Sequence, residues 1–130
     1  MDSLDLKKIL SNINVKADWI GLREVDETTT YRVIRDLNPE SDSTFVDHGI
    51  MVEVLVDGQF GYYGTHVLEE SSIIRAAEKA CEVASSASKY SVFPFTDKVR
   101  PASVGSYHSP YKIKNLPLDE LMDTLISSNK

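Results

Sequence analysis

Alternating apolar and polar residues over 48–56 and 59–65 predict two β-strands joined by a tight turn. Asp57 and Gly58 separate the two runs, and this pair favours a hairpin because both residues tolerate the positive φ angles of a two-residue turn. One face of the first strand carries only aliphatic side chains, namely Ile50, Val52, Val54 and Val56. The pattern therefore predicts a hairpin with one buried face.

The period changes from two residues to that of a helix directly after the hairpin. Over 69–89 a stripe of apolar and mostly small residues recurs at helical spacing: Ile73, Ala77, Ala80, Ala84 and Ala87. Glu69 and Glu70 lie at the predicted N-terminus, where carboxylates interact favourably with the helix dipole. Because small side chains allow close approach, we expect this helix to pack on the sheet.

Weaker patterns predict the remaining strands. Residues 17–26 alternate, and residues 28–36 are rich in β-branched side chains, so both segments favour strands with a turn near Glu27. The composition of 38–43 indicates a loop.

Two short helices complete the prediction, one over 3–12 that Ser3 would cap and one over 118–126. Several prolines over 90–117 indicate extended, irregular chain. We therefore expect one α+β domain over 1–130. It would have a small, mostly antiparallel sheet of about four strands, the long Ala-rich helix on one face, and short helices at both ends.

Charge and composition restrict the function. The chain has a formal net charge of −6 with scattered basic residues, and nucleic-acid binding needs clustered Lys and Arg, so no nucleic-acid partner is expected. No apolar run approaches the roughly 18 residues of a membrane span, so no membrane partner is expected either. Cys81 is the only cysteine, which fits a reducing compartment, and we expect a cytoplasmic location.

The hairpin and helix resemble the N-terminal domain of the TldD/PmbA family of metallopeptidases, also described as modulators of DNA gyrase. The resemblance rests on Gly49, Asp57-Gly58, Phe60-Gly61-Tyr62, Thr65, Leu68-Glu69-Glu70 and the alanines from Ala76 to Ala84. It is most specific over 49–87 and covers roughly 15–90, with Ala17-Asp18 as a weaker match. Met51 and Glu53 stand where the family often has Gly and Arg.

The resemblance implies a parent enzyme that is a dimeric, zinc-dependent peptidase acting on peptides or unfolded proteins. The family's zinc ligands lie in a downstream helical His-Glu-x-x-x-His motif. This sequence has no His-Glu dipeptide, and its histidines are His48, His66 and His108. We therefore expect a non-catalytic assembly and substrate-access domain, with zinc only in a catalytic domain that this chain lacks.

The expected partners are a second copy or a paralogous family subunit, with peptide as a substrate of the parent protein. Self-association is predicted through 91–126 and a sheet edge, since this segment carries apolar residues that a proline-rich chain buries poorly: Val92, Phe93, Phe95, Val99, Tyr107 and Tyr111. A tail folded back on its own sheet is the alternative. A free-standing protein-interaction module without enzymatic activity is the alternative function.

Other residues offer candidate sites beside simpler interpretations. Asp47, His48 and His66 would form a metal site across the hairpin, or are polar strand ends. Cys81 would be a nucleophile, or a buried thiol inside the helix. We assign no catalytic, cofactor-binding or metal residue to this chain.

Each of the remaining candidates also has a functional and a simpler structural interpretation. The glycines from Gly58 to Gly64 resemble a phosphate loop but lack its Lys, so turns and packing explain them better. The pairs Ser71-Ser72 and Ser85-Ser86 lie on the helix without a base nearby, and the acidic stretch 24–27 fits a solvated strand end. A set of aromatic residues would line a peptide groove or belong to the core: Phe60, Tyr62, Tyr63, Tyr107 and Tyr111.

Overall fold

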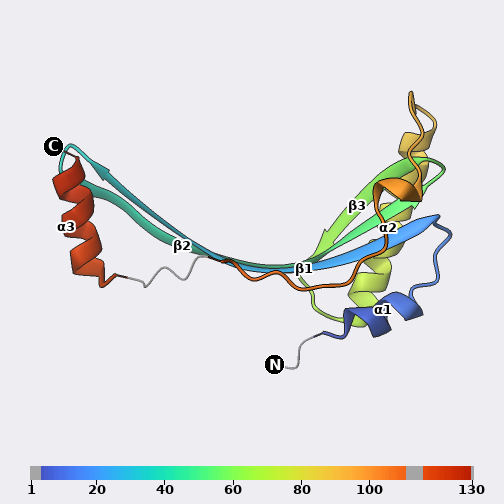
Figure 1. The fold of residues 1–130 in the computed structure, drawn as a ribbon, viewed down its shortest axis with the longest axis horizontal. Coiled ribbons are helices and arrows are strands. Elements are labelled where there is room, and N and C mark those ends of the chain that lie inside the picture. Colours follow the sequence, from blue (N-terminus) through green and yellow to red (C-terminus); the bar gives the residue numbers. More distant parts are fainter. Residues whose placement is uncertain (1–3, 111–115, 130) are drawn as a thin grey trace. The chain divides into compact units, whose positions relative to one another are not determined.

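The protein combines one antiparallel sheet with three α-helices (Figure 1), in a computed structural model that describes residues 4–110 and 116–129. In chain order the elements are α1 (Leu6–Asn12), β1 (Trp19–Arg35), β2 (Asn38–Val56), β3 (Gln59–Thr65), α2 (Glu70–Ser88), the 3₁₀ turn η1 (Asp97–Val99) and α3 (Leu118–Ser128). The strand order is β1-β2-β3. The predicted α+β class is confirmed, but the described residues form three strands rather than about four.

The first hairpin corrects the prediction of separate strands over 17–26 and 28–36. These segments form the single strand β1, and Glu27 lies inside it rather than in a turn. The turn lies at Asp36 and Leu37, with φ angles of 49° and 66°. A leucine at positive φ is unusual and gave no turn signal in the sequence.

The predicted loop over 38–43 is also wrong, because these residues begin β2. Pairing with β1 outweighs their low β-propensity. Cross-strand ion pairs accompany the pairing: Arg32 Nε lies 3.2 Å from Asp42 Oδ1, and Arg35 Nη1 lies 3.0 Å from Glu40 Oε1.

The second hairpin follows the predicted register and turn. β2 and β3 pair antiparallel from Ile50 opposite Thr65 to Val56 opposite Gln59. Asp57 and Gly58 form the turn with φ angles of 49° and 79°, as the sequence predicted.

One face of this hairpin forms the core with α2, which lies across β3 and β2 in Figure 1. The residues with no solvent exposure are Val52, Val54, Ile73, Ala77, Ala80 and Ala84. The predicted aliphatic face of β2 is therefore buried. On β3, Gly61 lets the backbone of α2 approach closely, because an added Cβ would lie 2.1 Å from the carbonyl oxygen of Ala80.

The N-terminal helix α1 contacts α2, and Asn12 Nδ2 donates a hydrogen bond of 2.7 Å to Glu70 Oε1. The cap of α1 is Asp5, whose carboxylate accepts from the backbone N–H of Lys8 at 3.1 Å. The predicted cap, Ser3, lies outside the described residues.

The chain divides into two compact units. The sheet–helix unit comprises 1–27 and 47–102, and it contains every buried residue in the described part of the chain. The hairpin–α3 unit comprises 28–46 and 103–130. Within it, the backbone N–H of Leu37 donates to Asn129 Oδ1 at 3.1 Å, which ties the hairpin turn to the end of α3.

Among the residues that the structure describes, no helix has the length and apolar character needed to cross a membrane.

The replacement Gly58→Val tests the second turn. We expect it to lower the free energy of unfolding by roughly 1 kcal/mol or more, because valine disfavours positive φ. An added Cβ would also lie 2.7 Å from Cβ of Pro94. Thermal melts check this, with Gly105→Val as the control, since nothing lies within 4 Å of a Cβ built there. Equal melting temperatures for the two variants would contradict the assigned turn.

Candidate functional site

The face of the sheet opposite α2 gathers charged and aromatic side chains. In the β2–β3 register, Glu53 lies opposite Tyr62, and Leu55 lies opposite Phe60. Directly opposed residues share a face, and this face alternates with the one that α2 covers. We call it the outer face.

A carboxylate lies at the centre of the polar contacts on the outer face. Glu53 Oε1 accepts a hydrogen bond of 2.8 Å from the Tyr62 hydroxyl and one of 3.2 Å from Arg100 Nε. Burial and then the hydrogen bond to Glu53 raise the pKa of Tyr62. The same carboxylate raises the pKa of Arg100 through its hydrogen bond and charge. At neutral pH the cluster is therefore an ion pair with a protonated phenol beside it.

Aromatic rings surround this ion pair. Phe60 contacts three other rings, with centroid distances of 6.4 Å to Trp19, 6.4 Å to Tyr62 and 5.6 Å to Phe95. The guanidinium carbon of Arg100 lies 5.5 Å from the Phe60 centroid, within the range of a cation–π contact. Rings and a carboxylate together suit the recognition of an aromatic and cationic segment.

The structure brings together only part of the aromatic set named from the sequence. Phe60 and Tyr62 share the outer face, whereas strand alternation places Tyr63 on the side of α2. Tyr107 belongs to the hairpin–α3 unit and is exposed, and Tyr111 lies outside the described residues. Sequence reasoning missed the ring contact of Trp19, because the alternation of 17–26 does not indicate a partner for this residue.

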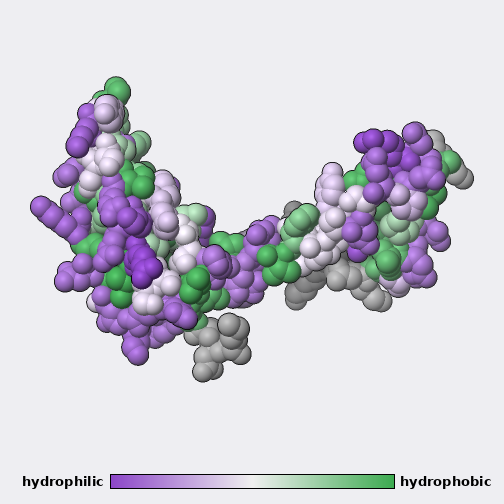
Figure 2. All heavy atoms as spheres, turned by 180° about the vertical axis from the view of Figure 1, so that it is seen from behind, coloured by the Kyte–Doolittle hydropathy of each residue, from purple (hydrophilic) through white to green (hydrophobic). Residues whose placement is uncertain are grey.

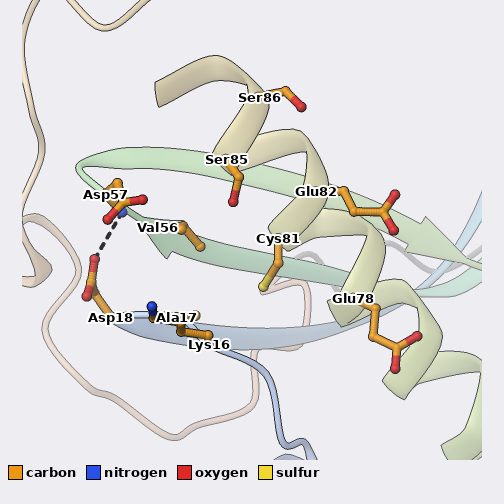
Figure 3. Close-up of a pocket in the computed structure, with 10 residues that line it drawn as sticks. All are labelled: Lys16, Ala17, Asp18, Val56, Asp57, Glu78, Cys81, Glu82, Ser85 and Ser86. Atoms are coloured by element: carbon orange, nitrogen blue, oxygen red, sulfur yellow. Dashed lines mark hydrogen bonds between the residues drawn. The ribbon is translucent and has the colours of Figure 1, made fainter. Parts of the chain in front are cut away.

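A second feature is a groove of about 620 Å³ beside α2, shown in Figure 3. It lies between the residues that precede β1, the Asp57-Gly58 turn and one side of α2. Carboxylates outnumber basic groups along it, with Asp18, Asp57, Glu78 and Glu82 against Lys16. The backbone N–H of Asp57 donates to Asp18 Oδ2 at 3.2 Å, which joins the turn to the start of β1.

The thiol of Cys81 also lines this groove, together with Ser85 and Ser86. Removal from solvent raises the pKa of Cys81. A raised pKa disfavours the thiolate, which is the nucleophilic form. The environment thus favours an unreactive thiol over a nucleophile.

The three residues of the hypothetical metal site line part of one shallow hollow of about 240 Å³. They are Asp47, His48 and His66. His48 Nε2 lies 2.9 Å from Glu24 Oε1, so its ring pairs with the middle of β1. This also corrects the view of 24–27 as a strand end, since these residues lie within β1. No three His, Cys, Asp or Glu side chains of the described residues form a group that could hold a metal ion. The described residues therefore do not fit the zinc ion that the family implies.

The glycines between Gly58 and Gly64 have structural roles in the second hairpin. Gly58 occupies the turn, and Gly61 lies against the backbone of α2. Neither belongs to a loop followed by a helix N-terminus, which is the arrangement that binds phosphate.

Comparison with known families identifies a region that contains most of the core and, on the outer face, Glu53, Phe60 and Tyr62. Residues 21–84 match the family model described as PmbA/TldA metallopeptidase domain 1, which is the family that the hairpin and helix resemble. No curated protein and no solved structure matches the chain.

Proposed function

Because this chain carries the first domain of the PmbA/TldA metallopeptidase family at residues 21–84, we propose that it is a non-catalytic part of such a peptidase. It serves assembly of the enzyme and access of peptides to the active-site chamber. The cleavage of peptides is then the task of the parent protein's zinc-binding domain.

The proposed role in assembly rests on the hairpin–α3 unit. None of its described residues is buried, although large apolar side chains are exposed on both of its segments. Tyr31, Phe45 and Val46 are 59%, 58% and 67% exposed, and Tyr107 is 83% exposed. Figure 2 shows apolar surface on the part of the molecule that contains this unit. Large apolar side chains that stay exposed are available for contact with a partner.

A second copy of the chain is the partner that we propose for this surface. Burial of apolar area would stabilise the association by roughly 25 cal/mol per Å² before the entropic cost of association is subtracted. The hairpin–α3 unit has no buried residue among those described, so a partner would bury apolar area that this unit leaves exposed.

Light scattering over a concentration series tests the assembly role. We expect the average mass to rise with concentration, and the double variant Phe45→Ser/Tyr107→Ser to reduce this rise at least severalfold because it removes apolar area from the hairpin–α3 unit. Tyr90→Ser is the matched control, since Tyr90 is 85% exposed but lies in the sheet–helix unit.

Two results would contradict the assembly role. One is a monomeric mass at every concentration. The other is an equal loss of association in Tyr90→Ser, which would move the interface to the other unit.

A further inference from the structure

The segment 91–100, called the strap here, lies against the outer face of the sheet. The backbone N–H of Phe95 donates to the carbonyl of Gly58 at 2.8 Å, and Gln59 Nε2 donates to Ser91 Oγ and to the carbonyl of Phe93. The strap therefore begins at the turn between β2 and β3. Its far end is held by the contacts of Arg100 with Glu53 and Phe60. Of the two alternatives for the tail, this part is folded back on its own sheet.

The strap covers the outer face without becoming buried itself. Every residue from Ser91 to Arg100 is exposed, and Phe93 and Phe95 are 72% and 40% exposed. Leu55 on the face below is only 1% exposed. The outer face is therefore shielded at Leu55, whereas Tyr62 on the same face is 48% exposed, and the strap itself contributes little apolar burial. Segments with few buried contacts open at a small fraction of the global unfolding free energy.

The contacts of the strap show which chemistry the outer face recognises. Phe95 supplies a ring to Phe60, and Arg100 supplies a guanidinium to the Glu53 carboxylate and to the face of the same ring. The carboxylate is 19% exposed and already accepts the Tyr62 hydroxyl, so its position is fixed before a cation arrives. The pattern is an aromatic residue followed five positions later by an arginine.

We propose that the outer face is a binding surface for an extended peptide segment of a partner protein, with an aromatic residue followed by an arginine at this spacing. The strap is the internal competitor for this surface, and the partner binds when the strap leaves. This surface belongs to the sheet–helix unit alone, so the proposal does not depend on the association proposed for the hairpin–α3 unit.

Competition of this kind has a measurable consequence. The apparent dissociation constant equals the intrinsic one divided by the fraction of molecules whose face is open. If the strap is seated in nine of ten molecules, its release strengthens binding by about tenfold.

The test uses a labelled peptide with the sequence of residues 91–102 and measures its binding to the full chain by fluorescence anisotropy. Arg100→Ala removes the contact at the far end of the strap, at a side chain that is 48% exposed, so the fold is expected to stay intact. We expect this variant to bind the peptide about tenfold more tightly than the unchanged chain. Lys98→Ala is the matched control, because it removes the same charge from the strap but leaves the Arg100–Glu53 pair in place. It is expected to bind like the unchanged chain.

Two further arms locate the binding on the outer face. Glu53→Gln in the Arg100→Ala background keeps an acceptor for Tyr62 but loses the charge, and we expect it to weaken peptide binding at least tenfold. A peptide with alanine in place of its arginine and of the phenylalanine that corresponds to Phe95 is expected to lose binding to the same degree.

Four results would overturn the proposal. Three of them are the absence of peptide binding to Arg100→Ala, equal binding to Arg100→Ala and Lys98→Ala, and peptide binding that does not change with Glu53→Gln. A dimer that the peptide dissociates, seen by light scattering, would assign the face to the strap of a second copy and would overturn the proposal too.

Discussion

Gly61→Ala is expected to lower the free energy of unfolding by about 3 kcal/mol, and the melting temperature by about 10 °C. The added Cβ would lie 2.1 Å from the carbonyl oxygen of Ala80 and 2.8 Å from the amide nitrogen of Ala84. Both are backbone atoms of α2, so no rotamer change relieves the overlap. The helix has to move away from β3, and this movement opens the packed face of the sheet.

Gly64→Ala is the matched control, because it makes the same change in the same strand. A Cβ at Gly64 would meet only Cε of Met51 at 3.6 Å and the carbonyl oxygen of Ile50 at 3.8 Å, which are ordinary contacts. We expect its free energy of unfolding to change by less than about 1 kcal/mol. Urea denaturation followed by circular dichroism compares the two. Equal stabilities would show that α2 does not rest on Gly61.

The parts of the fold that the sequence predicted are those with local signals. The Asp57-Gly58 turn fixes a short hairpin by itself, and the aliphatic alternation from Ile50 to Val56 determines which face is buried. Both signals extend over only a few residues, and the structure agrees with both.

The first hairpin shows why its turn and the beginning of β2 were not predicted. Its turn uses Asp36 and Leu37 at positive φ, and its second strand begins at Asn38 and Pro39. None of these residues favours a strand or indicates a two-residue turn as Asp-Gly does. Pairing across the hairpin decides their conformation, and a single sequence does not reveal that pairing.

The outer face was predicted in part for the same reason. The aromatic residues Phe60 and Tyr62 are near in sequence and were named as candidates for a groove. Arg100 lies 47 positions from Glu53, and the two meet only because the strap folds back from the end of α2. No periodicity connects such distant positions, so the ion pair between Arg100 and Glu53 could be found only from the structure.

Ala80→Glu is expected to have the largest effect, a loss of at least about 4 kcal/mol, which is a large share of the 5–15 kcal/mol typical of a domain. Ala80 has no solvent exposure and lies in the core cluster that α2 forms with the sheet. No buried polar or charged residue is present among the described residues, so the new carboxylate would have no buried partner. Urea denaturation at neutral pH measures the loss, or reports an unfolded chain.

Ala87→Glu makes the same change at an exposed position of the same helix and is expected to cost less than about 1 kcal/mol. The pH dependence separates the cost of the charge from the cost of the added volume. Burial would raise the pKa of the new carboxyl in the folded state above its unfolded value, so the charge penalty is complete above the folded pKa. At each pH the free energy of unfolding of Ala80→Glu is compared with that of the unchanged chain. This difference in free energy should shrink as the pH falls through the folded pKa and then below about 4. A difference that stays constant with pH would attribute the loss to volume alone, and a stable Ala80→Glu variant at neutral pH would contradict the position of Ala80 between α2 and the sheet.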